Sequence, residues 1–160
     1  MPQVLTRDFG LLDCDQCSEL DFPHGLPGFE LEKRFALIQK DSLAPMLLLQ
    51  SLQTPEVCFH TLPALAVDPG YQIGMTEDDQ RIVGYADHSG LTNSPGAGVR
   101  AGEFLCLVIL SATGPDNRVT ANLLAPVVVN LQSNVAVQAV RCDFRYSHQH
   151  PLQTGAMPCS

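Results

Sequence analysis

The sequence predicts an all-β, mostly antiparallel fold with one short helix, built either as a sandwich or as a barrel. Short apolar runs of strand length alternate with turn residues at a spacing of about ten residues, which is typical of such folds. Apolar residues make up 45% of the chain and aromatic residues only 6%, so the core must be mainly aliphatic. The length of 160 residues indicates a single domain over residues 1–160.

Apolar runs separated by proline, aspartate, serine or threonine predict the elements of the first half of the chain. The expected strands are Val4–Leu12, Phe35–Gln39, Met46–Leu52, Val57–Thr61 and Tyr71–Met75. An acidic stretch with Cys14 and Cys17 ends the first of these strands. Residues 62–69 contain two prolines and are expected to cross from one strand to another as a loop.

Two local signals are specific enough to predict a turn and a helix. Pro27 followed by Gly28 fits the central pair of a type II turn, because proline presets a negative φ and glycine accepts the positive φ that follows. Thr76 precedes three acidic residues, and this order predicts the N-cap and first turn of a short helix over Thr76–Val83.

The second half of the chain holds the longest apolar runs. Phe104–Ala112 and Val119–Asn130, joined by a turn-rich segment, predict a hairpin at the heart of the core. Val135–Val140 is expected to be the last strand. Residues 86–102, rich in glycine, serine and asparagine, are expected to be a mobile surface loop, and residues 153–160 a frayed tail.

The second run of this hairpin contains an interruption. Val127 and the two valines after it favour extended backbone, whereas Pro126 lacks the N–H that a strand ladder needs. We therefore expect an incompletely paired apolar edge near Pro126, of the kind that can receive a partner.

Charge is distributed unevenly along the chain, whose formal net charge is −8. Residues 1–80 carry 13 acidic and 4 basic side chains, whereas residues 81–160 carry 4 acidic and 5 basic ones. An acidic chain repels phosphate backbones, so we expect no direct nucleic-acid binding and an attraction to basic protein partners. Solubility alone would explain the acidic residues equally well.

The cysteines and the apolar runs bear on location. No basic region followed by an apolar stretch opens the chain, and no apolar run approaches the length of a membrane span. We therefore expect a cytoplasmic protein with reduced thiols and no membrane contact. Cys14 and Cys17 have the spacing of half a zinc site, but the second ligand pair is missing, so we expect no metal.

No motif of a known catalytic class is present. The chain lacks a phosphate-binding loop, a Gly-x-Ser-x-Gly elbow and a His-Glu-x-x-His pattern, so we expect a binding protein without a cofactor rather than an enzyme. The alternative is a small ligand-binding β-barrel, or a hydrolase that uses His60 or His148. That alternative predicts a deep pocket with convergent polar groups.

Five segments of the chain together resemble the family of the flagellar assembly factor FliW. They are Phe22-Pro-His-Gly-Leu-Pro-Gly-Phe-Glu30, Leu49-Gln-Ser51, Asn122-Leu-Leu-Ala-Pro-Val-Val-Val-Asn130, Gln138 and Tyr146-Ser-His-Gln-His-Pro-Leu152. The match is collinear across most of the chain. A Gly-Leu-Pro-Gly-Phe turn alone is weak evidence, whereas its combination with a later Asn-Leu-x-Ala-Pro-Val segment is specific.

The resemblance implies a compact β-barrel-like domain in the cytoplasm of a flagellated bacterium, which acts by binding. It implies two partners. One is flagellin before its export, and the other is CsrA, a small basic RNA-binding dimer that represses flagellin translation. Once flagellin is exported, the freed protein would bind CsrA away from its RNA-contacting surface and relieve the repression allosterically.

We expect a partner-binding surface at the interrupted strand, formed by Asn122, Leu123, Leu124, Ala125 and Pro126. The alternative is that Leu123 fills the core while Asn122 ties a bulge. The chain departs from the family pattern in two places. The loop over residues 86–102 is longer than expected, and Arg141 stands where an apolar residue is usual.

Overall fold

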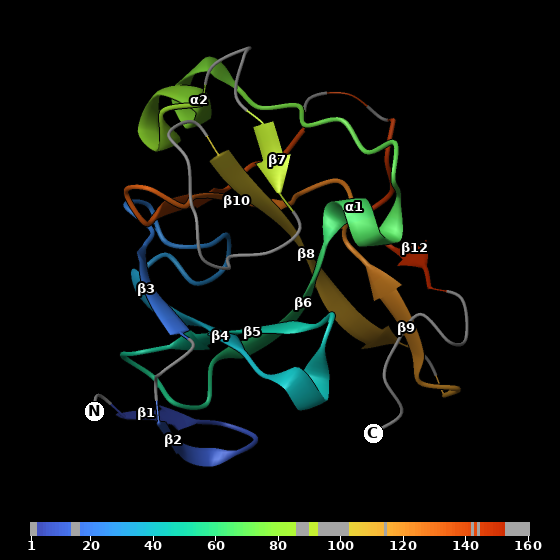
Figure 1. Ribbon diagram of the computed structural model, residues 1–160. Helices are drawn as coiled ribbons and strands as arrows, with labels where there is room; N and C mark the ends of the chain where they lie inside the picture. The colour runs from blue at the N-terminus through green and yellow to red at the C-terminus, as the bar shows by residue number, and fades with distance from the viewer. Residues whose placement is uncertain are drawn as a thin grey trace.

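The structure is a computed structural model that describes residues 3–13, 17–85, 90–92, 103–113, 115–141, 143 and 145–152. At its centre, seven strands form a closed barrel (Figure 1). Around the barrel their order is β3 (Cys17–Asp21), β4 (Arg34–Gln39), β5 (Leu47–Ser51), β6 (Cys58–Pro63), β8 (Glu103–Thr113), β10 (Val127–Asn130) and β11 (Val135–Gln138). The predicted all-β, mostly antiparallel class is therefore confirmed, as a barrel.

Two junctions close the barrel. Strand β8 pairs antiparallel with β6 on one side and with β10 on the other. Between β11 and β3 the pairing is parallel and consists of the single pair Val135 and Asp21. Closure removes most of the free strand edges that an open sheet would present.

The apolar run of β8 is continuous because both of its faces are buried, as predicted. Leu105 and Leu107 point into the barrel, where they pack with residues such as Phe22, Phe35 and Val127. The alternate residues of β8 point outward, into a second core that helix α2 (Glu77–Val83) and the one-turn helix α1 (Ala64–Val67) help to cover.

The predicted hairpin of the second half is confirmed, and its interrupted strand consists of two. Strand β9 (Arg118–Ala121) pairs with one end of β8, and β10 pairs with the other end. Between them, residues 122–126 leave the ladder. On its outer side β10 pairs with β11 in the barrel, whereas β9 pairs with β12 (His150–Pro151).

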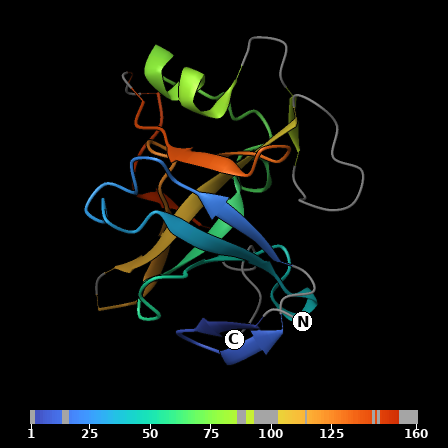
Figure 2. The same cartoon turned by 90° about the vertical axis from the view of Figure 1, so that its left-hand side faces the viewer.

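A third, smaller core lies under an N-terminal hairpin. Strands β1 (Gln3–Thr6) and β2 (Gly10–Asp13) form a two-stranded sheet of their own. Val4 packs against residues of β4 and β5 such as Ile38 and Leu48. Figures 1 and 2 show this hairpin at one end of the barrel, while α2 lies at the other.

The predicted single strand over Val4–Leu12 is therefore wrong. The hydroxyl of Thr6 accepts a hydrogen bond from Phe9 N (2.9 Å) and donates one to Gly10 O (2.7 Å). These bonds close a turn in the middle of the apolar run. The acidic stretch that was expected to end this strand also differs from the prediction, because its last part, from Cys17 onward, forms β3.

The predicted strand over Tyr71–Met75 is also wrong, because this segment is not in a strand. Side chains rather than a ladder satisfy its polar groups: Tyr71 Oη donates to Leu123 O (2.7 Å), and the Arg141 guanidinium donates to Gln72 O. The predicted helix is confirmed as α2, with Asp79 N donating to Thr76 Oγ1 (3.1 Å) at its N-cap. Two helical turns were not predicted, namely α1 and the 3-10 turn Asp41–Leu43.

Parts of three predictions lie outside the described residues. The mobile loop was predicted over residues 86–102, of which the structure describes only 90–92; these form β7 (Gly90–Thr92), which pairs parallel with β8. The predicted frayed tail, residues 153–160, and Cys14 are not described. Cys17 is disulfide-bonded, so the prediction of reduced thiols is wrong for this residue, whereas Cys58 and Cys106 are free and buried.

Candidate functional site

A groove of about 260 Å³ opens on the surface where the interrupted strand passes the loop between β3 and β4. It is lined by Leu26, Pro27, Phe29, Phe59, Ile109, Ser111, Thr120, Asn122, Gln138, His148 and Gln149. Most of these residues belong to the segments that carry the family resemblance. Segments far apart in the sequence therefore meet in one place.

One wall of the groove is the turn around Pro27 and Gly28. Gly28 has a φ of +85°, and Phe29 N donates to Leu26 O over 2.7 Å. Gly25 has a φ of +64°, and a Cβ built on it would lie only 2.6 Å from Glu30 O, so glycine alone fits there. The turn is thus held in one conformation by its backbone.

The two phenylalanines that flank this turn have different environments. Phe22 is fully buried and packs edge-on against Phe35, with the ring centroids 5.1 Å apart. Phe29 is 40% exposed and packs edge-on against Phe59 in the groove at 5.4 Å. The loop is therefore anchored by Phe22, while the Phe29 ring is presented to the groove.

Two further lining residues, Asn122 and Gln138, are both held by hydrogen bonds to Ala125. Asn122 Oδ1 accepts hydrogen bonds from Leu124 N (3.1 Å) and Ala125 N (3.0 Å). Gln138 Nε2 donates to Ala125 O over 3.0 Å. The side-chain amides of Asn122 and Gln138 are thus fixed to the same residue, one through its N–H and the other through its C=O.

The five residues of the predicted partner-binding surface differ in exposure. Leu123, Ala125 and Pro126 are buried, whereas Asn122 and Leu124 are partly exposed. Leu123 belongs to the outer core, and Asn122 ties the break. Any contact of this segment with a partner must therefore be made mainly by the side chains of Asn122 and Leu124.

The expected open backbone edge at this segment is absent from the structure. Asn122 N donates to Ile109 O (2.9 Å) and Leu123 N to Ser147 O (3.0 Å). Two further bonds, from Arg141 N to Leu124 O (3.0 Å) and from Ala139 N to Pro126 O (2.8 Å), satisfy the carbonyl side. Pro126 interrupts the ladder as predicted, but other parts of the chain supply the missing partners, which excludes addition of a strand at these groups.

The Leu49-Gln-Ser51 segment has a structural role in the fold. Gln50 is fully buried, where its Oε1 accepts from Arg7 N (2.9 Å) and its Nε2 donates to Pro55 O (2.9 Å). Ser51 Oγ accepts from Thr54 N over 3.0 Å. This segment therefore fastens the N-terminal hairpin and the β5–β6 turn to the barrel, away from the groove.

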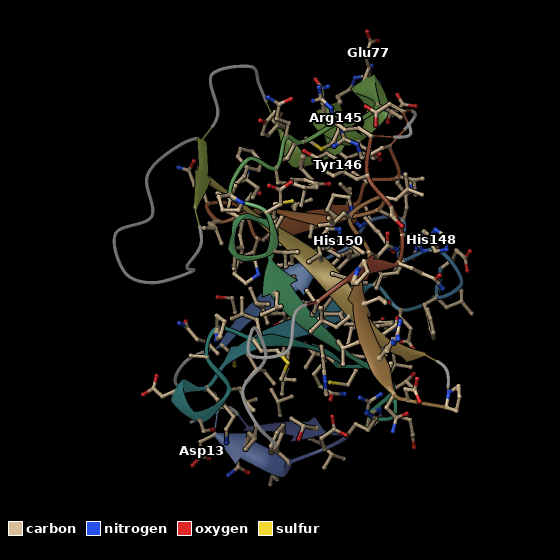
Figure 3. The ribbon with its side chains drawn as sticks, turned by 90° about the vertical axis from the view of Figure 1, so that its right-hand side faces the viewer. Asp13, Glu77, Arg145, Tyr146, His148 and His150 are labelled. Atoms are coloured by element: carbon tan, nitrogen blue, oxygen red, sulfur yellow. The ribbon has the colours of Figure 1, made fainter. Side chains whose placement is uncertain are left out.

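The two histidines of the hydrolase alternative lie in different places. His60 Nε2 lies 3.0 Å from Asp8 Oδ2, at the contact between the N-terminal hairpin and the barrel. The nearby Cys58 thiol is no activated nucleophile, since burial raises its pKa to about 11. His148 lines the groove and lies on the C-terminal segment between Tyr146 and His150 (Figure 3).

A ligand-binding barrel would need space in its interior, and the described residues pack that interior with side chains. Large side chains fill it, among them Phe22, Phe35, Leu49, Leu105 and Val129. In the described part of the chain, no three His, Cys, Asp or Glu side chains are placed to share a metal ion. None of the helices found in that same part has the length and apolar character that crossing a bilayer needs.

Gln138 and Phe29 line the groove but were not predicted as site residues, although both lie in segments that carry the family resemblance. Each has a feature in the sequence that could have indicated it. Gln138 is an amide at the end of a short apolar strand, and Phe29 is a second phenylalanine that follows the Pro27-Gly28 turn. The lining residues Phe59, Ile109 and Thr120 carry no such signal, because they belong to ordinary strand sequence.

Comparison with known proteins gives a consistent result. A model of the FliW family, described as FliW protein, matches residues 3–152. A protein of Heliobacterium modesticaldum (strain ATCC 51547 / Ice1), named flagellar assembly factor FliW, is 31% identical over 152 residues, which cover 94% of this chain and 90% of that protein. One of the same name from Anoxybacillus flavithermus (strain DSM 21510 / WK1) is 31% identical and covers 93% of each chain.

The fold matches as well. The crystal structure of the flagellar assembly factor FliW superimposes with a TM-score of 0.73 and 25% sequence identity. The match covers 95% of this chain and 97% of that one. The likeness therefore extends over the whole barrel and the segments around it.

Proposed function

The chain belongs to the FliW family of flagellar assembly factors, and we propose that it binds two protein partners in the cytoplasm, flagellin and CsrA. While it holds flagellin, CsrA represses flagellin translation. When flagellin is exported, the freed protein binds CsrA and relieves the repression. Synthesis of flagellin then follows its secretion.

The observation that carries the proposal is the convergence of the family segments on one surface groove. Pro27, Asn122, Gln138 and His148 come from four separate parts of the chain and line the same space. None of them fills the barrel interior. Side chains from separate parts of the chain that meet at one surface groove are the arrangement that a shared binding site needs.

Charge supports CsrA as one of the partners. The chain carries 17 acidic and 9 basic side chains, and a basic dimer would be steered toward it. Such complementarity raises the association rate more than the final affinity, and salt screens it.

Leu124 provides the first test of where partners bind. Replacing this partly exposed residue by glutamate places a charge at the interrupted strand, where Asn122 and Leu124 are the accessible side chains. We expect Leu124→Glu to weaken flagellin or CsrA binding at least tenfold, which corresponds to about 1.4 kcal/mol. Isothermal titration calorimetry with each purified partner measures the change.

The matched control is Leu31→Glu, which makes the same substitution at a leucine that is 84% exposed. Circular dichroism and thermal unfolding of both variants establish that they are folded. Unchanged affinity of folded Leu124→Glu for both partners would remove this segment from the proposed binding surface. If the wild-type protein binds neither partner, the proposed function itself is wrong.

A further inference from the structure

We infer that the groove binds an extended, uncharged peptide segment, in which the N–H and C=O of one residue are held by Gln138 and Asn122 and an apolar side chain packs on Phe29. The inference rests on the proposed function, because the segment belongs to one of the two protein partners. It adds the chemistry that the groove selects.

The hydrogen-bonding network fixes which atoms of the two amides face a ligand. Asn122 Oδ1 accepts from two backbone N–H groups, so this atom must be the oxygen, and Nδ2 is left as a donor. Gln138 Nε2 donates to a carbonyl, so Oε1 is left as an acceptor. Among the described residues, neither Asn122 Nδ2 nor Gln138 Oε1 has a hydrogen-bond partner.

These two atoms complement the N–H and C=O of one residue in an extended strand, which point to the same side of the strand. A ligand C=O can accept from Asn122 Nδ2, and a ligand N–H can donate to Gln138 Oε1. Both amides are already fixed to Ala125, so little side-chain freedom is lost on binding. In a helix the backbone groups are paired internally, and for this reason the ligand must be extended or in a turn where it meets these residues.

The rest of the groove selects against charge. None of its lining residues is an aspartate, glutamate, lysine or arginine, although the chain carries 26 such residues. A charged ligand side chain would lose water there without gaining an opposite charge. The Phe29 ring, 40% exposed and supported by Phe59, instead offers an apolar surface. A volume of about 260 Å³ admits side chains of a peptide and not a folded domain.

The test compares two substitutions of asparagine by aspartate. Asn122→Asp keeps an oxygen for Leu124 N and Ala125 N, but it replaces the Nδ2 donor by a charged acceptor. Asn117→Asp makes the same change at an exposed turn that does not line the groove. The probes are overlapping synthetic peptides that cover the flagellin and CsrA of the same bacterium, together with both intact partners.

We expect the wild-type protein to bind peptides that carry no net charge and contain an apolar residue. Asn122→Asp should bind the tightest of these at least tenfold more weakly, whereas Asn117→Asp should bind within twofold of the wild type. In spectra of ¹⁵N-labelled protein, the same peptide should shift the side-chain NH₂ signals of Asn122 and Gln138. A merely structural role of Asn122 would leave its signal unmoved by the peptide.

The outcomes separate this inference from the proposed function. If both intact partners bind the wild type and Asn122→Asp equally well, the groove is not the site and the proposed function stands. Selection of basic peptides would likewise overturn the inference. Failure of both intact partners to bind the wild type would overturn both. Phe29→Ala provides a second variant, with Leu31→Ala as its exposed control on the same loop, and equal binding by these two would exclude the apolar contact.

Discussion

At the scale of single residues, Arg141 is the clearest case of a side chain whose role only the structure explains. Its side chain is 3% exposed, and it donates two hydrogen bonds to the Asp143 carboxylate, at 2.9 and 3.0 Å. The guanidinium also lies over the rings of Tyr146 (4.7 Å) and Tyr71 (5.7 Å). The charge of Arg141 is thus paired and stacked, and its bond to Gln72 O ties the C-terminal segment to residues 71–75.

Replacing Arg141 by methionine should lower the free energy of unfolding by about 2 kcal/mol, because hydrogen bonds of a buried charged group are lost. Urea denaturation followed by circular dichroism measures the change. The control is Arg81→Met, which removes an exposed ion pair with Asp78 and should change stability by less than about 0.5 kcal/mol. Equal effects of the two substitutions would contradict the role given to Arg141.

The same cluster predicts how stability depends on acid. Hydrogen bonds from Arg141 hold the pKa of Asp143 below its ordinary value of 3.8, and Arg7 and then His60 lower that of Asp8. A carboxyl whose pKa is lower in the folded than in the unfolded state stabilises the fold above the unfolded pKa. That contribution is lost as the pH falls through the folded pKa.

We therefore expect the free energy of unfolding to decrease as the pH is lowered below about 4. Asp143→Asn should show a smaller decrease over the same range, because its side chain no longer titrates. Denaturation curves at a series of pH values test this. A variant whose acid dependence equals that of the wild type would show that Asp143 contributes nothing to it.

At the scale of elements, α2 is the helix whose boundaries the sequence sets most directly. Removing the Thr76 hydroxyl should cost about 1 kcal/mol, since Asp79 N would lose its capping partner. Thr76→Ala and Thr76→Ser, compared by thermal unfolding, test the cap. The serine variant keeps the hydroxyl and should restore most of the lost stability; if it is as unstable as the alanine variant, the cap is not the cause.

The strands that the sequence predicted correctly are those whose apolar residues are buried without help from unusual turns or distant side-chain hydrogen bonds. The apolar run of β8 is buried on both faces, and so are those of β4 and β5, whose residues pack alternately into the barrel and under the N-terminal hairpin. The prediction of one strand over Val4–Leu12 is wrong because the Thr6 hydroxyl closes a turn within this segment. The prediction of a strand over Tyr71–Met75 is wrong because two side chains distant in the sequence take backbone groups that a ladder would need: the Arg141 guanidinium donates to Gln72 O, and Tyr146 Oη accepts from Gln72 N.

The sequence predicted only part of the candidate site, because the rest depends on contacts between distant parts of the chain. Asn122 and Pro126 marked the interruption of the strand, and the structure places that interruption beside the groove. The backbone partners of residues 122–126 come from β8, from residues 139–141 and from Ser147. No local pattern reveals such long-range bonds, so the sequence suggested an open edge where the structure has a closed one.

At the scale of the whole molecule, the net charge of the chain contrasts with the uncharged lining of the groove. The chain as a whole has a net charge of −8, whereas the groove is lined by uncharged side chains apart from the titratable His148. An acidic surface suits a basic partner over long distances, and a neutral groove suits an uncharged segment in direct contact. The molecule therefore offers two kinds of recognition.

We propose that this protein exchanges one partner for the other. The most direct test is a calorimetric titration of purified CsrA into the protein alone and into the protein saturated with flagellin. The account predicts saturable binding in the first titration and a large loss of binding in the second. Equal CsrA binding in both titrations would contradict the exchange, and the absence of binding to either partner would contradict the proposed function as a whole.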